Sequence, residues 1–230
     1  MKNFLITLCI LSSFIAANSG AATAPAPGAT TTIMVFGDSL SAGYGLPQEA
    51  GWVSLLKRRL QTVSQASLIN NSISGETAMG GRNRIEQALK THRPDIVIVE
   101  LGGNDGLRGA SIDSIRDNLE AIIDACQRHK ATVLLAGMQL PPNYGMTYTQ
   151  KFQDIYPQLA KRHGLKLVPF LLDGFGSKRE FFQAEGIHPT AQAQEKIVEN
   201  VWKVLRTMIA GSVNKSSRAS SDQTDISYHK

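Results

Sequence analysis

The stretch that decides the fold is Ile33–Ser41, which reads IMVFGDSLS, an apolar run that stops at a Gly-Asp pair. A short run rich in β-branched and aromatic residues indicates a buried strand, and the Gly-Asp break ends that strand in a sharp turn. Ser39 then falls at the carboxyl end of the strand, the edge of an open α/β sheet where ligands bind. Because Gly-Asp-Ser also forms ordinary turns, this stretch alone does not indicate a catalytic serine, and partner residues elsewhere in the chain are needed.

Four more apolar runs follow, separated by segments with helical periodicity, and this alternation predicts a parallel sheet with helices on both faces. We therefore expect an α/β fold in three layers, α/β/α, around a five-stranded parallel sheet. The expected strands are Thr31–Phe36, Ser67–Asn70, Asp95–Leu101, Thr132–Gly137 and Lys166–Pro169.

Amphipathic stripes, in which apolar residues recur every three or four positions, predict the main helices. Thr147–Gln150 has the spacing of a capping box and predicts a further helix through about Lys161. Pro189 suits the first turn of the last helix and so places His188 at a junction between loop and helix. The striped helices are Trp52–Val63, Ile112–His129 and Ala191–Ile209.

The first residues have the order of a secretory signal, with Lys2, then an apolar run and then small residues up to Ala22. The apolar run is shorter than the roughly 20 residues of a membrane span. We expect a signal peptide at residues 1–22, a periplasmic or secreted protein, and no stable membrane insertion after cleavage. Cys126 would then be the only cysteine, so a single domain over residues 30–210 must be stabilised by its core. The Ser-rich residues 211–230 are expected to be a disordered tail.

The formal net charge of +5 is modest, and the basic residues are scattered without interleaved aromatics, which disfavours nucleic-acid binding. The chain contains no HExxH, CxxC or P-loop motif, and Gly43–Pro47 lacks the helix and the acid of a dinucleotide fingerprint. We therefore expect no metal and no cofactor, and a monomer that acts on a small molecule.

Three other polar segments occupy positions comparable to that of Ser39. Ile73–Glu76 follows the second expected strand, Leu101–Asp105 follows the third, and Glu185–Pro189 precedes the last helix. Parallel strands bring their carboxyl ends to one edge, so these loops become neighbours after folding.

Together with Gly37–Ser41, these segments resemble the four signature blocks of the SGNH (GDSL) hydrolase family, and the body is similar to its bacterial branch of thioesterase I, lysophospholipase L1 and arylesterase. The resemblance covers about Ile33–Ala193 and includes Gln139–Gly145, which is similar to a mobile substrate-side loop of that branch. It implies the flavodoxin-like fold of that family. It also implies a nucleophile at Ser39, a general base at His188, and an oxyanion hole made by the Ser39 N–H, the Gly75 N–H and the Asn104 side chain.

The chemistry agrees with these roles, because a hydroxyl is a weak nucleophile until an imidazole takes its proton and fixed donors stabilise the oxyanion. Gly75 is expected to let its N–H approach the intermediate because it has no Cβ. His188 stands apart from the histidines that fall at expected helix ends, where a cation favours the helix dipole. Those histidines are His92, His129 and His163.

One position departs from the family pattern. The family has Asp three residues before the histidine, where this chain has Glu185, whose carboxylate must fold back to reach the ring of His188. We expect Glu185 to orient His188, since a Ser-His-Glu arrangement also works in hydrolases. Asp173 and Asp154 are alternatives without that tight spacing. A G-x-S-x-G elbow is absent because Ser41 takes the place of its last glycine, which disfavours an ordinary α/β-hydrolase.

These observations predict a serine esterase that hydrolyses carboxylic esters and thioesters of acyl chains, including lysophospholipids, through an acyl-enzyme. Two alternatives stay open at this point. A carbohydrate O-acetyl esterase uses the same scaffold, although the aromatic content of 7% and Pro141–Tyr144 favour the acyl branch. A non-catalytic ligand-binding domain would keep the pocket and lose turnover through the change to Glu185.

Overall fold

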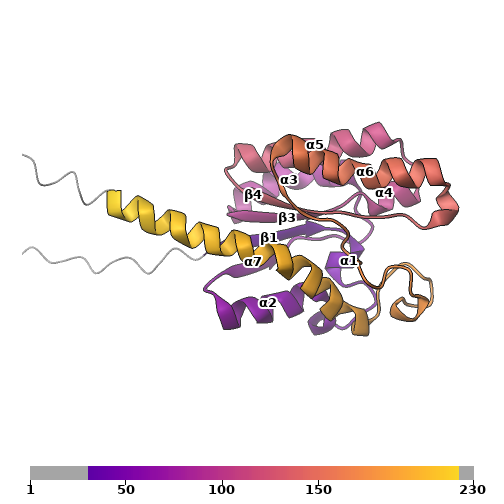
Figure 1. Cartoon of the computed structure of the whole chain (residues 1–230), viewed down its shortest axis with the longest axis horizontal. Coiled ribbons are helices and arrows are strands. Elements are labelled where there is room, and N and C mark those ends of the chain that lie inside the picture. The colour runs from indigo at the N-terminus through magenta and orange to yellow at the C-terminus, as the bar shows by residue number, and fades with distance from the viewer. Residues whose placement is uncertain (1–30, 223–230) are drawn as a thin grey trace, which may run out of the picture.

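The computed structural model describes residues 31–222 and shows one sheet between two layers of helices (Figure 1). The sheet has five strands in the order β2-β1-β3-β4-β5, and every pairing is parallel. The α/β fold predicted from the sequence is thereby confirmed. The strands are β1 Thr32–Gly37, β2 Ser67–Asn70, β3 Ile96–Glu100, β4 Thr132–Ala136 and β5 Lys166–Val168.

The strand order reverses at β1, which has β2 on one side and β3 on the other. In open α/β sheets, the crevice outside the carboxyl ends of the strands at such a switch point is where ligands bind. β1 leads directly into the short helix α1, Ser39–Ala42, and β3 leads through two residues into α4, Gly103–Leu107. The sequence order therefore places Ser39 and Asn104 beside the switch point.

Five longer helices cover the sheet, with α3, α5 and α6 on one face and α2 and α7 on the other (Figure 1). Contacts between α3 and α5, between α5 and α6, and between α2 and α7 hold each layer together. Three 3-10 turns lie in the loops: η1 Gln48–Ala50, η2 Pro142–Tyr144 and η3 Arg179–Phe181. The longer helices are α2 Trp52–Val63, α3 Ala78–His92, α5 Ile112–Arg128, α6 Met146–His163 and α7 Ala191–Asp222.

The core is continuous from the sheet into both helix layers. Ile33–Phe36 and Val97–Val99 are fully buried, as expected for the two central strands of a sheet covered on both faces. Each fully buried aliphatic side chain contributes about 1.5–3 kcal/mol relative to exposure. Cys126 is a free, buried thiol, and burial raises its pKa to about 12, so it serves as a core residue.

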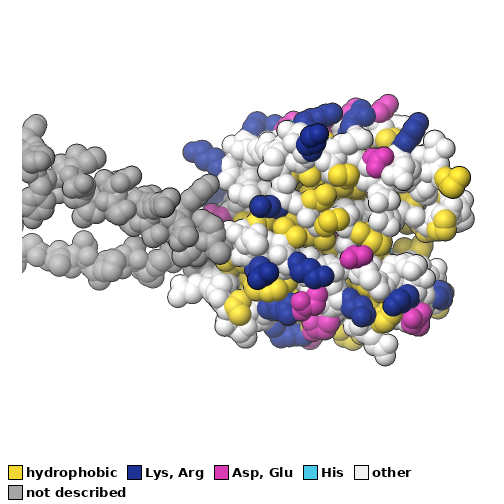
Figure 2. Space-filling view, viewed as in Figure 1, with side chains coloured by type: hydrophobic (Ala, Val, Ile, Leu, Met, Phe, Trp, Pro, Cys, Tyr) yellow, Lys and Arg dark blue, Asp and Glu magenta, His cyan; other side chains and the backbone are white. Residues whose placement is uncertain are grey.

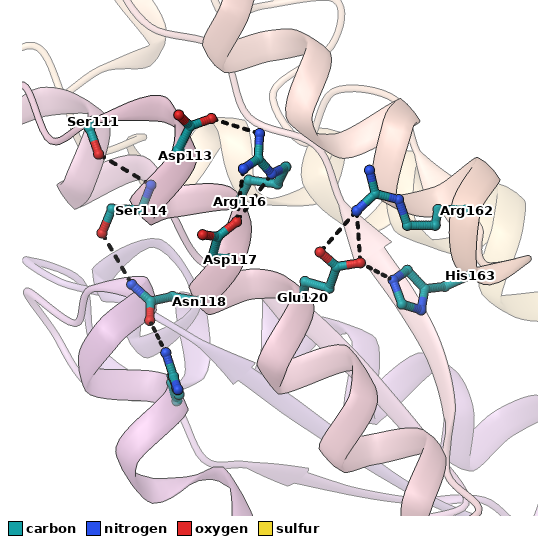
Figure 3. Close-up of polar contacts among 10 residues, drawn as sticks. Ser111, Asp113, Ser114, Arg116, Asp117, Asn118, Glu120, Arg162 and His163 are labelled. Carbon is teal, nitrogen blue, oxygen red and sulfur yellow. Dashed lines mark hydrogen bonds and ion pairs between the residues drawn. The ribbon is translucent and has the colours of Figure 1, made fainter.

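Polar contacts along α5 tie it to its neighbour in the layer (Figure 3). Glu120 accepts hydrogen bonds from Nη1 of Arg162 at 2.9 Å and from Nε2 of His163 at 2.8 Å, both in the last turn of α6. These bonds lower the pKa of Glu120. His163, which the sequence placed at a helix terminus, therefore anchors that terminus to α5.

Charges on the face seen in Figure 2 are dispersed, with Lys and Arg side chains interleaved with Asp and Glu. Among the residues that the structure describes, no helix is both long enough and apolar enough to cross a membrane. The expected signal peptide at residues 1–22 lies outside the described residues, as do residues 223–230.

Two local expectations are corrected. α6 begins at Met146 after Gly145, and no side chain caps it, so the capping box expected at Thr147 does not form; the Thr149 hydroxyl instead donates back to the carbonyls of Gly145 and Met146. α7 continues to Asp222, whereas the sequence predicted a disordered tail from residue 211. The physical reason is that extending a helix whose first part is already packed avoids the cost of nucleation.

Candidate active site

Three predicted side chains meet in series at the switch point. The Oγ of Ser39 lies 2.9 Å from Nε2 of His188, and Nδ1 of His188 lies 2.9 Å from Oε1 of Glu185. An ionised carboxylate only accepts hydrogen bonds, so Nδ1 carries the proton and Nε2 of the neutral ring accepts from the Ser39 hydroxyl. Ser39 and His188 are 149 positions apart in the chain, and the fold brings them together.

Local structure fixes the serine. Asp38 caps α1, because its Oδ1 accepts from the backbone N–H of Leu40 at 3.0 Å, and this places Ser39 in the first turn. Ser39 is 9% exposed, so its hydroxyl reaches the surface only through the cavity beside it. The local sequence therefore sets the backbone of Ser39 in the first turn of α1, with the residue at the cavity wall.

Glu185 folds back on His188, as its spacing required. Its Oε1 accepts from the backbone N–H of His188 at 2.9 Å as well as from the ring. These hydrogen bonds lower the pKa of Glu185, with the backbone N–H of His188 as the largest cause. Asp154 instead accepts from Gln150 within α6, and Asp173 lies on the cavity wall. Of the three acids considered from the sequence, Glu185 has the contact with His188.

Of the two further members of the expected oxyanion hole, Gly75 lies in the loop after β2, and Asn104 lies in the first turn of α4, which follows β3. Nδ2 of Asn104 donates to Oδ2 of Asp38 and to the carbonyl of Glu76, both at 3.0 Å. Gly75 has φ of 80°, and its carbonyl accepts from Arg108 at 3.3 Å. No heavy atom lies within 4 Å of the position where a Cβ would stand. The left-handed backbone therefore favours glycine at this position, and the expected close approach of the Gly75 N–H to the intermediate stays a prediction.

A cavity of about 840 Å³ opens beside this series and is lined by Ser39, Asn104 and His188. The first part of the expected substrate-side loop Gln139–Gly145, namely Gln139–Pro142, forms part of its wall. Most of the remaining wall is apolar, which suits the burial of a hydrocarbon chain next to the serine. The apolar side chains include Leu107, Met138, Leu140, Phe170, Phe175 and Phe182.

A pair of buried carboxyl groups lies behind the serine and was not foreseen. Glu100, at the end of β3, is fully buried, and its Oε2 accepts from the Ser41 hydroxyl at 2.6 Å and from the Asp38 N–H at 3.3 Å. Burial raises the pKa of Asp38 to about 6 and that of Glu100 well above its ordinary value. The signal in the sequence was an acidic residue that closes the apolar run of β3, where a strand buried on both faces offers it no water.

Tyr44 is a second neighbour that sequence reasoning missed. Its ring centroid lies 4.5 Å from that of His188, with 36° between the ring planes. The carbonyl of Tyr44 also accepts from the side chain of Gln183 at 2.8 Å, which joins the loop after α1 to the loop that carries His188. These contacts hold the imidazole against the surface next to Ser39.

A hydroxyl, an imidazole and a carboxylate hydrogen-bonded in this order are the reactive groups of serine hydrolases, here placed at the carboxyl edge of a three-layer α/β sheet. Sequence comparison agrees with this class, because the profile of the GDSL-like lipase/acylhydrolase family matches residues 35–196. The chain belongs to that family. It is a serine esterase or thioesterase of the SGNH type, a carboxylic ester hydrolase.

Individual relatives support this assignment. Esterase TesA of Pseudomonas aeruginosa is 42% identical over 182 residues, which are 79% of this chain and 90% of the relative. Thioesterase 1/protease 1/lysophospholipase L1 of Escherichia coli is 40% identical over 79% of this chain and 86% of its own length. A crystal structure of TesA superposes with a TM-score of 0.75 at 43% identity and covers 77% of this chain and 99% of its own.

A second solved structure is that of the psychrotrophic esterase EstA from Pseudoalteromonas, inhibited by monoethylphosphonate. It has a TM-score of 0.75 and 35% identity, and the match covers 78% of this chain and 99% of that one. The similarity therefore extends over nearly the whole length of each structural relative.

Proposed function

We propose that this protein hydrolyses carboxylic esters and thioesters of acyl chains through an acyl-enzyme formed on Ser39. The observation that carries the proposal is the hydrogen-bonded series from Ser39 through His188 to Glu185, next to a largely apolar cavity. Relatives named as an esterase, an arylesterase and a thioesterase/lysophospholipase support the substrate class.

In the proposed reaction, Nε2 of His188 takes the proton of Ser39 as Oγ attacks the carbonyl carbon. The tetrahedral intermediate collapses when the imidazolium returns this proton to the leaving alcohol or thiol, and a water molecule then repeats the sequence on the acyl-enzyme. Glu185 holds the ring tautomer and stabilises the imidazolium, as the carboxylate of a catalytic triad does.

The proposed oxyanion hole consists of the backbone N–H groups of Ser39 and Gly75 and the side chain of Asn104. Both Nδ2 hydrogens of Asn104 are engaged in the free protein, with Asp38 and with the carbonyl of Glu76. We propose that one of these N–H groups turns towards the oxyanion as it forms. A donor that strengthens its hydrogen bond only in the transition state lowers the barrier without tightening substrate binding.

The contact between Glu185 and His188 disfavours the alternative of a non-catalytic ligand-binding domain. That alternative assumed that turnover is lost because a glutamate cannot orient His188. For the carbohydrate O-acetyl esterase, the cavity offers an apolar wall better suited to acyl chains than to sugars. We further propose that the mature protein works in the periplasm or outside the cell, on the basis of the expected signal peptide at residues 1–22, and that it is a monomer.

The proposal is tested with p-nitrophenyl esters of increasing acyl length and with an acyl-CoA thioester. Ser39→Ala is expected to abolish hydrolysis, whereas Ser177→Ala, which removes a hydroxyl from the same cavity wall, is expected to retain it. A fluorophosphonate probe followed by peptide mass spectrometry is expected to label Ser39 in the wild type. Hydrolysis by Ser39→Ala at the wild-type rate, or a label on another residue, would contradict the proposal.

A further inference from the structure

The guanidinium of Arg179 lies against the loop that carries Glu185. Its Nη1 donates to the carbonyls of Phe182 at 3.0 Å and Gln183 at 2.7 Å, and its Nη2 donates to the carbonyl of Ala184 at 2.6 Å. Three consecutive carbonyls therefore converge on one cation. An arginine suits this task because its planar fork is always charged and presents several donors in fixed directions.

Other bonds hold the two ends of this loop, among them those from the Gln183 side chain to the carbonyls of Tyr44 at 2.8 Å and Pro189 at 3.3 Å. The backbone N–H of Gln183 donates to the carbonyl of His188 at 2.8 Å, and that of Gly186 donates to the carbonyl of Gln183 at 3.0 Å. A single isolated bridge pairs Phe182 with Pro189. Between these bonds, Ala184 and Glu185 are exposed and belong to no helix or strand. Arg179 supplies the bond to the peptide that immediately precedes Glu185.

The position of Glu185 depends on this backbone. A single oxygen, Oε1, makes both contacts with His188, and the Glu185 side chain is 41% exposed, so packing does little to hold it. A glutamate also has one more rotatable bond than an aspartate, and a displaced loop would let the carboxylate leave the ring. The carbonyls on Arg179 fix the start of the turn from which Glu185 folds back.

We propose that Arg179 is a positioning residue for the hydrolytic reaction, acting through the Glu185 loop to keep the carboxylate on Nδ1 of His188. This inference rests on the proposed function of Ser39, His188 and Glu185. Arg179 also lines the cavity, but three of the five N–H groups of its guanidinium already donate to backbone carbonyls of this loop, which favours positioning over substrate binding.

A double-mutant cycle tests the proposal in the full-length protein. With a neutral p-nitrophenyl ester, Arg179→Ala is expected to lower kcat by about tenfold or more and to leave KM within about twofold. In a Glu185→Ala background, the same substitution is expected to change kcat by less than about twofold, because the group through which Arg179 acts is gone. Arg179→Lys, which keeps the charge but not the fork, is expected to fall between Arg179→Ala and wild type.

Lys178→Ala is the matched control, since it removes a neighbouring exposed cation that does not line the cavity, and it is expected to behave like wild type. Thermal unfolding of every variant separates loss of the loop geometry from loss of the fold. If Arg179→Ala does not fold, Arg179→Lys replaces it in the cycle.

Two outcomes would overturn the inference. One is that Arg179→Ala lowers kcat by the same factor in the wild-type protein and in the Glu185→Ala variant. The other is an increase in KM confined to an anionic acyl-CoA thioester, which would make Arg179 a substrate-binding cation. Failure of the proposed function is distinguishable from both, because wild type would then show no hydrolysis that depends on Ser39.

Discussion

A single oxygen of Glu185, Oε1, lies 2.9 Å from both the backbone nitrogen and Nδ1 of His188. The glutamate thus bonds to both the backbone and the ring of the same histidine. Its side chain, one methylene longer than that of aspartate, folds back over the turn between residues 185 and 188 to do so. Orientation of the ring and of the loop is therefore coupled through one atom.

This geometry predicts a functional carboxylate. Glu185→Ala is expected to lower kcat on the order of 10²–10⁴-fold, because the imidazolium loses its partner and the ring loses its orientation. Glu185→Asp restores the length usual in the family, and we expect its kcat to lie within about tenfold of wild type. Steady-state kinetics on a p-nitrophenyl ester distinguishes the two. Unchanged turnover in Glu185→Ala together with faster turnover in Glu185→Asp would show that the carboxylate is vestigial.

Asn104→Ala is expected to reduce kcat by about 10²–10³-fold with little change in KM, the signature of an oxyanion donor that acts in the transition state. Loss of stability is controlled with Asn200→Ala, which removes another amide that donates to backbone carbonyls, those of Leu171 and Asp173 at 3.0 Å. That variant is expected to unfold at a lower temperature and to keep its kcat at low temperature. Equal kcat in both variants would remove Asn104 from the reaction.

Gly75→Ala tests the backbone conformation of the second block. A φ of 80° costs an L-residue about 1–2 kcal/mol, although the space for a methyl group is open. We expect the free energy of unfolding to fall by about 1 kcal/mol or more and kcat to fall as the N–H turns away. Gly164→Ala, at the end of α6 with φ of 64° and equally open space, should have the same stability cost and normal kcat. Identical kinetics of the two variants would exclude a role for the Gly75 N–H.

The buried carboxyl pair predicts that stability falls as pH rises. The unfolded chain releases these protons near the ordinary pKa values of 3.8 for Asp38 and 4.5 for Glu100, whereas burial raises the pKa to about 6 for Asp38 and well above 4.5 for Glu100. The folded state therefore holds more protons, and the stability present below pH 3.8 is lost through pH 6 and above.

Glu100→Gln tests this pair because the amide cannot ionise and keeps an oxygen for the donors on Ser41 and Asp38. Between about pH 5 and about pH 8, we expect its free energy of unfolding to fall less than that of wild type, because one of the two raised carboxyl pKa values no longer contributes. Urea denaturation at a series of pH values measures the difference. Parallel curves for the two proteins would show that the pair does not retain a proton.

Much of the fold follows from local patterns, because apolar runs and turn residues determine strand positions without reference to the rest of the chain. β2 has the predicted bounds, β4 and β5 end one residue earlier than predicted, and β1 and β3 differ by one residue at each end. The start of α6 was misplaced because the letters at Thr147 fit a cap, whereas the backbone enters the helix from Gly145. The helix beyond Ile209 was missed because propagation depends on packing earlier in α7.

The residues of the site also fall into two groups, those marked by a local motif and those whose contacts depend on the whole fold. Ser39 and His188 are marked by their motifs, and their contact was expected because parallel strands share an edge. Tyr44 and Arg179 are not marked, because their contacts join loops whose paths depend on the whole fold. Glu100 had a local signal, but its partnership with Asp38 arises only when β1 and β3 pair in register.

The separation of 149 positions between Ser39 and His188 has a consequence for how activity appears during folding. Contacts between distant segments form late, since closing so long a stretch of chain has an entropic cost that only the assembled sheet repays. A refolding chain should regain its helical circular dichroism before it regains turnover. The enzyme is thus expected to have no hydrolytic activity until nearly all of its domain has folded, so ester cleavage can be used to follow the late stage of folding.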